Sequence, residues 1–571
     1  MLKRGLLTAA VTALIMPTSA VAATTLMPGV TYTRDVRAVS GRAVVLHVMR
    51  MPRHGGLYGL RPVLSNNTVL GRETLPVMQR RVAGVGTVVG VNGDLFKPDT
   101  GQPTGVFLRD GVLATRPVPR RSMLGIAFDG RLVVDRLRFA GSWKVAGLEA
   151  HPLEDVNRPL ADPPGVGLFT PQWNARTPRY PTAKEVVLTG FPRLLTNGWL
   201  TGTVATIRRG GGSVVPRGAA ILHARGFWAR ILAREARPGT QVTVRVQLRD
   251  LPADVADAIG GGPVLVRNGQ AVLRPDESFA PSHMNVRHPR TAVGQRADGR
   301  LIFLVAEGRS SRSAGLTHAQ LARQMVRLGA VTAVGMDGGG SSTMAFEGRV
   351  LNRPSEGALR PVANGLFFYY YGIFAPRPRR AVISPNGDRV ADSQVLTARV
   401  VRRSSVDLRL VRPNGTIAWR FRDVVAPQRL SRRVGTRGMA EGTWRWVVEA
   451  TRVQNGRESR MARAFIVNRT LGHLRLSKER MRVVSGKGGR LAIAVNVTRR
   501  ANVNVSVRSA SGRVIRVLQR GEIGRGGHAW RWAGRNALRK VVPSGTYTVR
   551  VTARNTLGTV ALAKAVRVVR T

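Results

Sequence analysis

The stretch "TAVGQRADGRLIFLVAEG", residues 291–308, consists of two apolar runs joined by a polar turn. Each run has the length of a strand, and the Asp-Gly dipeptide at 298–299 is typical of a tight hairpin turn. The pattern predicts that Thr291–Gln295 and Leu301–Glu307 pair as an antiparallel hairpin. Similar short apolar runs recur over residues 30–374, which favours one strand-rich domain there.

A helix and another strand follow this hairpin. A Thr-x-x-Gln capping box at 317–320 precedes an apolar stripe that stops at Gly329, so the sequence predicts a helix between them. The run "VTAVGMD", residues 331–337, then reads as a strand. We expect a second helix over Ala253–Ala258. Strands with a few helices indicate an α+β domain.

The composition is that of a multidomain globular protein. The chain has 571 residues, 43% of them hydrophobic, which suggests about three or four folding units. It has no cysteine, which excludes disulfides, cysteine nucleophiles and thiolate metal sites.

The first residues have the pattern of a secretory signal peptide. Lys3 and Arg4 precede the short apolar run Gly5–Met16, and Ala20-Val21-Ala22 matches a cleavage site. We predict a signal peptide over residues 1–23; an uncleaved membrane anchor is the alternative. No second apolar run reaches the ~20 residues of a membrane span. The mature chain is therefore expected to be secreted, with a possible association with the cell wall.

The chain is strongly basic, with 90 Lys and Arg against 32 Asp and Glu and a formal net charge of +58. Such a surface attracts polyanions. For an exported chain, anionic cell-wall polymers or phospholipid headgroups are favoured over nucleic acid. A general compositional bias towards arginine is the alternative.

The last third of the chain has an all-β pattern. The segment "APRPRR", residues 375–380, marks a linker, and two series of strands with Pro-Asn-Gly and similar turns follow it. The two series align as a repeat of roughly 95 residues. They predict two tandem Ig-like β-sandwich modules, over residues 377–468 and 470–571.

The segment "DGGGSST", residues 337–343, is the strongest candidate for a site. Apolar strands flank it on both sides, which argues against a flexible linker, and no Gly-Lys-Ser/Thr follows, which excludes a Walker-type phosphate loop. Its three glycines allow positive φ and a cluster of N–H groups aimed at one anion. Alone, the segment fits a buried structural turn equally well.

Other polar clusters also lie at predicted strand ends. If these ends converge, they bring carboxylates and guanidiniums to the glycine turn. Paired carboxylates suit glycoside hydrolysis, and arginine forks suit phosphate. Together they indicate a sugar joined to a phosphate. The clusters comprise Asn92, Asp94, Arg290, Thr291, Glu307, Arg309, Arg353, Arg360 and Asn364.

In order and spacing, these motifs resemble the phosphodiester glycosidase family over roughly residues 85–370. The sequence departs from the family pattern at Gly335, Glu307 and Gln320, where the family usually has Asn, Asp and an acid. The matching motifs are Asn92–Phe96, Gly262–Leu265, Pro289–Ala292, Glu307–Arg309, Asp337–Thr343 and Asn352–Ser355 with Arg360 and Asn364.

The second C-terminal module resembles the Ig-like module of flagellar hook-capping proteins, which implies a fold and an accessory role. The aromatic residues of the shared pattern are expected in the core. The pattern comprises Trp530, Trp532, Gly534, Pro543, Gly545, Tyr547 and Val549.

The family resemblance implies a hydrolase acting on a phosphate-linked glycan. Asp337 would act as acid, base or nucleophile, with Asp94 or Glu307 as its partner and Thr291 beside them. The expected substrate-binding residues are Asn92, Arg290, Arg309, Gly338, Gly339, Gly340, Ser341, Ser342, Thr343, Arg360 and Asn364.

Several alternatives remain open at this stage. Asp94 and Asp337 could bind Ca²⁺ or Mg²⁺ together with main-chain carbonyls. Arg309 and Arg360 could instead be ion-pair partners of the carboxylates. The whole protein could be a cell-surface binding or structural protein with an inactive glycosidase-like domain.

Overall fold

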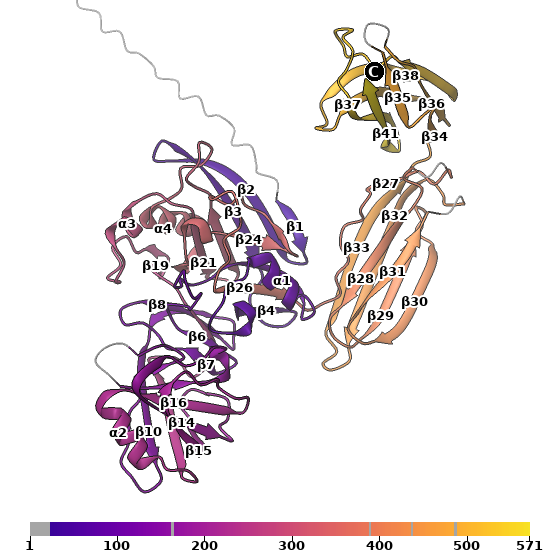
Figure 1. The fold of residues 1–571 in the computed structure, drawn as a ribbon. Coiled ribbons are helices and arrows are strands. Elements are labelled where there is room, and N and C mark those ends of the chain that lie inside the picture. Colours follow the sequence, from indigo (N-terminus) through magenta and orange to yellow (C-terminus); the bar gives the residue numbers. More distant parts are fainter. Residues whose placement is uncertain (1–22, 161–164, 388–389, 436–437, 485–487, 571) are drawn as a thin grey trace, which may run out of the picture. The chain divides into compact units, whose positions relative to one another are not determined.

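The structure is a computed structural model, which describes residues 23–160, 165–387, 390–435, 438–484 and 488–570. The chain divides into two compact units, one ending at Tyr370 and one beginning at Tyr371 (Figure 1). Residues 1–22 of the predicted signal peptide lie outside the described residues. Within the described ranges, no helix has the length and apolar character needed to cross a membrane.

The predicted hairpin forms the centre of an eight-stranded sheet, in which β21 pairs with β22 in antiparallel register. This confirms the pairing expected from the turn at 298–299. In spatial order the strands are β1 (Thr24–Met27), β2 (Val30–Val39), β3 (Arg42–Met51), β22 (Leu301–Ala306), β21 (Arg290–Arg296), β23 (Ala330–Gly335), β19 (Val264–Arg267) and β20 (Gln270–Ala271).

Helix α4 (His318–Arg327) covers part of this sheet. Thr317 caps it, accepting from Gln320 N–H while the Gln320 side chain accepts from the Thr317 N–H, so the predicted capping box is confirmed. Its apolar side chains Leu321 and Met325 are fully buried in one core with Ala292 of β21 and Ala333 of β23. This packing fixes the hairpin against β23, the strand that leads into Asp337.

A five-stranded sheet carries the other strand ends that matter for the site. Helix α1 (Leu75–Val82) packs against β5. The spatial order is β25 (Arg349–Val350), β24 (Met344–Phe346), β5 (Thr87–Asn92), β26 (Asn364–Tyr370) and β4 (Tyr58–Leu64).

The helix expected over Ala253–Ala258 is wrong. Residues Val255–Gly260 form strand β18 between β6 and β8, because two neighbouring strands supply hydrogen-bond partners that outweigh the local helix propensity of alanine. The sheet order is β7 (Val112–Thr115), β6 (Phe107–Arg109), β18, β8 (Ser122–Ala127) and β9 (Leu132–Arg136).

An insertion between β9 and β18 builds a second eight-stranded sheet, drawn in magenta in Figure 1, against which α2 (Gly226–Glu235) packs. Its buried side chains share one core with those of β6 and β8. The order is β11 (His151–Pro152), β10 (Arg138–Val145), β17 (Gln241–Arg249), β15 (Trp199–Gly211), β14 (Arg179–Thr189), β16 (Ala219–Ala224), β13 (Val166–Phe169) and β12 (Asp155–Val156).

The second unit is all-β in its described residues. Its first part contains a five-stranded sheet and a two-stranded sheet. The strands of the five-stranded sheet are β27 (Val382–Ile383), β33 (Glu458–Val467), β32 (Gly442–Arg452), β29 (Ser404–Val411) and β30 (Ile417–Val425), and those of the other are β28 (Gln394–Val400) and β31 (Gln428–Val434).

The following part of the second unit also has two sheets, and Trp532 and Tyr547 are buried in its core as predicted. The three-stranded sheet is β34 (Leu471–Leu476), β36 (Leu491–Val497) and β39 (Gly526–Trp532); the five-stranded sheet is β35 (Arg480–Val483), β41 (Gly558–Arg570), β40 (Gly545–Asn555), β37 (Ala501–Ser509) and β38 (Val514–Ile523). The predicted class, an α+β region followed by Ig-like β-modules, is confirmed.

Candidate active site

A cavity of about 270 Å³ opens where β21 begins and β23 ends. The glycine turn forms part of its wall: Gly339 has φ +61°, and residues Gly339–Ser341 make a single 3-10 turn. Glycine adopts this φ without the strain that a side chain would add. The lining comprises Leu95, Ser282, His283, His288, Arg290, Arg309, Asp337, Gly338, Gly339, Gly340 and Arg360.

Asn92, the last residue of β5, connects this strand to β21 and to the residue Asp337 that follows β23, through hydrogen bonds of its side-chain amide. Its Nδ2 donates to the carbonyl of Asp337 at 2.8 Å, and its Oδ1 accepts from Thr291 Oγ1 at 2.7 Å and from Thr343 N at 3.1 Å. Asn92 is fully buried. Its amide therefore fixes the backbone around the glycine turn, and Asn92 is not among the residues that line the cavity.

Thr291 was predicted among the catalytic residues, but it is fully buried. Its hydroxyl donates to Asn92, and its carbonyl accepts from Met336 N at 2.9 Å. These contacts hold β21 against the end of β23, so Thr291 positions Asp337 through the backbone and has no contact with the cavity.

Asp337 is the carboxylate that lines the cavity. Its N–H donates to the carbonyl of Gly93 at 2.9 Å. Partial burial raises the pKa of Asp337 to about 6, while Ser341 and the charges of Arg360 and Arg290 act in the opposite direction. The group is therefore mostly ionised at neutral pH and can accept a proton or stabilise a cationic transition state.

Asp94 lies beneath the cavity with its side chain 3% exposed. Its Oδ2 accepts from Gly105 N at 2.6 Å, and a methyl group on Gly260 would overlap the same oxygen. Burial raises the pKa of Asp94 to about 7, and the charge of Asp337 adds to the increase. Asp94 is thus a buried carboxyl group that does not itself line the cavity.

Arg290, predicted to bind phosphate, is among the residues that line the cavity, but it is 1% exposed and donates to backbone carbonyls. Its Nε donates to Leu316 O at 3.0 Å, and its Nη2 donates to His283 O at 2.6 Å and to Val286 O at 2.8 Å. Burial lowers the pKa of Arg290 to about 10. The guanidinium clamps the segment that contains α3 (Pro281–Asn285) onto the cavity.

Two further guanidiniums, those of Arg309 and Arg360, line the cavity in partly exposed positions. Arg309 is a non-glycine residue with φ +58°, and its Nε and Nη2 donate to His288 Nδ1, each at 3.2 Å. Arg360 pairs with Glu356. The Arg309 guanidinium lies beside the glycine turn, where a methyl group on Gly339 would come within 3.2 Å of Nη2. Arg309 and Arg360 together are suited to binding one phosphate.

Glu307, predicted as a catalytic partner, is engaged elsewhere. Its Oε1 is 2.8 Å from His47 Nε2 and accepts from Arg353 N at 2.7 Å, and His47 Nδ1 is 2.8 Å from the Tyr32 hydroxyl. Burial acts to raise the pKa of Glu307, but the bonds from His47 and Arg353 outweigh it and lower the pKa. Glu307 therefore belongs to a hydrogen-bond network with His47 and Tyr32 and does not line the cavity.

The remaining predicted residues build the scaffold. The carbonyl of Ser342 accepts from Asn352 Nδ2 at 2.9 Å, and Asn364 Oδ1 accepts from Asp94 N at 2.8 Å. Ser341, Ser342, Thr343 and Asn364 are all buried behind the glycine turn.

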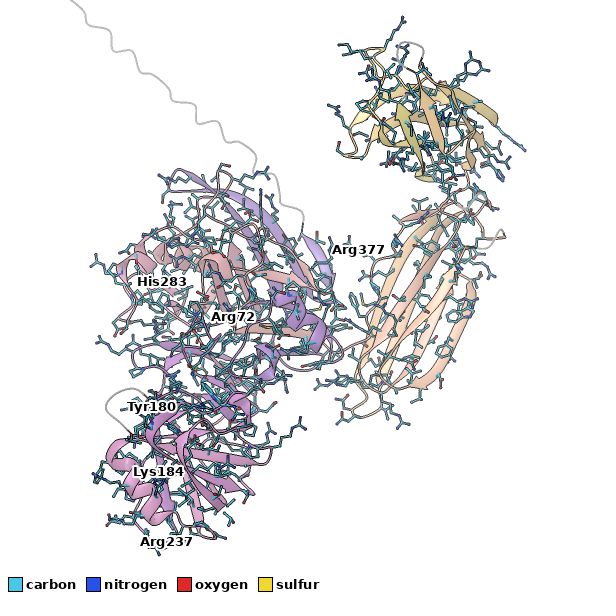
Figure 2. The ribbon with its side chains drawn as sticks, viewed as in Figure 1. Arg72, Tyr180, Lys184, Arg237, His283 and Arg377 are labelled. Atoms are coloured by element: carbon cyan, nitrogen blue, oxygen red, sulfur yellow. The ribbon has the colours of Figure 1, made fainter. Side chains whose placement is uncertain are left out.

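Four residues around the cavity were not among the predicted site residues. Ser282, His283 and His288 come from the segment that Arg290 clamps, where Figure 2 labels His283. Burial, with the charge of Arg290, lowers the pKa of His283 to about 4, so its ring is neutral at pH 7. The carboxylate of Glu356 lies against Gly340. Residues 356–360 are not helical, so their spacing in the sequence did not predict this placement of Glu356.

The proposed Ca²⁺ or Mg²⁺ site has few supporting contacts. Among the described residues, no group of three or more His, Cys, Asp or Glu side chains is placed to hold a metal ion. Asp94, one of the two predicted ligands, accepts a backbone N–H and is buried.

Comparisons with known proteins identify the families that the two regions of the chain resemble. The family model described as phosphodiester glycosidase matches residues 186–369, and that described as FlgD Ig-like domain matches residues 480–556. A crystal structure of a hypothetical protein from Synechocystis has a TM-score of 0.52 at 20% identity, covering 62% of this chain and 64% of that chain. At this identity the likeness is one of fold.

Two curated relatives match shorter stretches. The SPbeta prophage-derived uncharacterized protein YomE of Bacillus subtilis (strain 168) is 42% identical over 87 residues, which is 15% of this chain and 14% of that protein. The N-acetylglucosamine-1-phosphodiester alpha-N-acetylglucosaminidase of Mus musculus is 31% identical over 102 residues, 17% of this chain and 19% of that enzyme. The matches span less than a fifth of either relative. The chain thus carries a phosphodiester glycosidase domain followed by a FlgD Ig-like module, as its motifs predicted.

Proposed function

We propose that the protein is an exported hydrolase that cleaves the bond between the anomeric carbon of a sugar and the oxygen of a phosphodiester. The observation that carries this proposal is the cavity itself, in which Asp337, two partly exposed guanidiniums and the glycine turn face one space. The phosphodiester glycosidase match and the name of the mouse relative support the same substrate class.

In this reaction, Arg309 and Arg360 hold the phosphate, and the glycine turn adds its N–H groups. The bond from the anomeric carbon to the phosphate oxygen breaks, and its electrons leave with the phosphate. Water forms the new bond to carbon, and Asp337 accepts its proton. A phosphate leaving group needs little help from an acid, so one ionised carboxylate in the cavity is sufficient. The products are the free sugar and a phosphomonoester.

The test is incubation of the full chain with N-acetylglucosamine-1-phosphodiester and related sugar-1-phosphodiesters, followed by assay of free reducing sugar. Release that depends on Asp337 supports the proposal. No release from any of them, with retained binding to anionic polymer, would favour the alternative of a binding protein with an inactive glycosidase-like domain.

Replacing Arg309 or Arg360 by Ala should raise KM for a sugar-1-phosphodiester by about 10- to 100-fold, because each loses a charge-assisted contact to the phosphate. Steady-state kinetics on both variants checks this. Arg349→Ala removes an exposed arginine outside the cavity lining and should behave as the wild type. An equal rise in KM in all three variants would contradict a phosphate-specific role.

We further propose that the β-modules retain the enzyme on an anionic cell-wall polymer. Arg429, Arg432 and Arg433 of β31 and Arg480 and Arg482 of β35 are exposed. A row of positive charges on a strand attracts a polyanion.

Deleting residues 377–571 should therefore reduce retention on an anionic polymer several-fold while leaving turnover of a small soluble substrate within about twofold. Co-sedimentation with the polymer at low and high salt measures retention. Unchanged retention, or equal loss of retention and turnover, would contradict the proposed division of roles.

A further inference from the structure

One carboxylate lies within the proposed phosphate subsite. Glu356 pairs with Arg360 through both side-chain oxygens, with Arg360 Nε at 3.1 Å from Oε2. Its Oε1 is also 3.9 Å from Arg309 Nη1. A methyl group on Gly340 would overlap all three atoms of the carboxylate. Glu356 therefore bridges the two cavity arginines and lies directly on the glycine turn.

This carboxylate sets the charge that a ligand meets. Arg309 and Arg360 provide two positive charges, and Glu356 cancels one of them, so the three side chains together carry a single positive charge. A phosphodiester carries one negative charge, whereas a phosphomonoester carries nearly two at neutral pH. The negative charge of Glu356 therefore opposes binding of the monoester nearly twice as strongly as binding of the diester.

We infer that Glu356 is a specificity-determining residue that weakens the binding of a doubly charged phosphomonoester more than the binding of a singly charged phosphodiester. This inference rests on the proposed function, in which the substrate is a diester and the product a monoester. The charge of Glu356 therefore disfavours retention of the product more than it disfavours binding of the substrate. All three side chains are about 40% exposed, at 39%, 42% and 39% for Glu356, Arg309 and Arg360, so solvent screening moderates the effect without removing it.

The test compares two probes of similar size and different charge. Dimethyl phosphate is a monoanion, and methyl phosphate is a dianion at pH 8. Their dissociation constants are measured by calorimetry at low ionic strength on the full chain and on Glu356→Gln, without reference to turnover. Gln keeps the shape over Gly340 and one acceptor oxygen for Arg360. Glu149→Gln removes the same charge from an exposed position outside the cavity and serves as the matched control.

Coulomb energy is proportional to ligand charge, so the logarithm of the affinity change should double for the dianion. We expect Glu356→Gln to bind dimethyl phosphate about threefold and methyl phosphate about tenfold more tightly, with both unchanged in Glu149→Gln. The inference is overturned if the two dissociation constants change equally in Glu356→Gln, if neither changes, or if binding becomes weaker. These outcomes would leave the phosphate subsite itself intact. If neither probe binds any of the three proteins, the phosphate subsite and the proposed function fail together.

Discussion

Replacing Asp337 by Asn should lower kcat/KM for a sugar-1-phosphodiester by about 10³-fold or more. Asp337 is the carboxylate that lines the cavity, and Asn can neither accept the proton of the attacking water nor stabilise positive charge on the sugar. The backbone contacts that hold residue 337 involve its N–H and carbonyl, which the substitution keeps. Assay of free reducing sugar under single-turnover conditions measures the loss.

The pH dependence of the wild type supplies the control. Because the pKa of Asp337 is raised to about 6, the active carboxylate form predominates above that pH. The rate should therefore fall about tenfold per pH unit below 6. Near-normal turnover in Asp337→Asn, or a rate that is flat from pH 4 to 7, would exclude Asp337 as the base.

The second large effect concerns stability and originates at Asp94. Its pKa is raised from 3.8 to about 7 in the folded chain because the carboxyl is buried. The folded state therefore binds this proton more tightly than the unfolded state does. The contribution of Asp94 to the free energy of unfolding should therefore be greatest below pH 4. It should decrease by roughly 4 kcal/mol as the pH rises to 7.

Asp94→Asn removes the titrating group and should flatten this part of the pH dependence. Urea unfolding of the wild type and the variant at several pH values between 4 and 8 measures the difference. Asn keeps one oxygen for the Gly105 N–H, but its NH2 group replaces the second acceptor, which serves the Leu95 N–H. We therefore expect the variant to be less stable than the wild type at pH 4, by about 1–3 kcal/mol. The same pH slope in both proteins would show that Asp94 is charged throughout.

Local patterns predicted much of the fold. The hairpin at β21 and β22 and the capping box of α4 follow from turn chemistry and periodicity over fewer than about 20 residues each. The failure at Ala253–Ala258 has a different origin. That segment becomes β18 because β6 and β8, which are distant in sequence, flank it. Pairing over such separations leaves no local signal.

The candidate site divides in the same way. Asp337 and the glycine turn were predictable because strand, carboxylate and glycines are contiguous. The roles of Arg290 and Glu307 were not, because a guanidinium that binds carbonyls and one that binds phosphate look identical in sequence. Only the burial of Arg290 and the contact of Glu307 with His47 distinguish them. His283 and Glu356 depend on the same long-range placement.

The contacts of Arg290 have a consequence for how such an enzyme can change. The guanidinium donates hydrogen bonds to the main-chain carbonyls of His283 and Val286 in the segment around α3. A main-chain carbonyl is present whichever side chain the residue has. Ser282, which lines the cavity from this segment, can therefore vary without loosening the attachment. Natural variants or a saturation library at position 282 could alter substrate preference on an unchanged frame, which makes this segment a natural starting point for directed evolution.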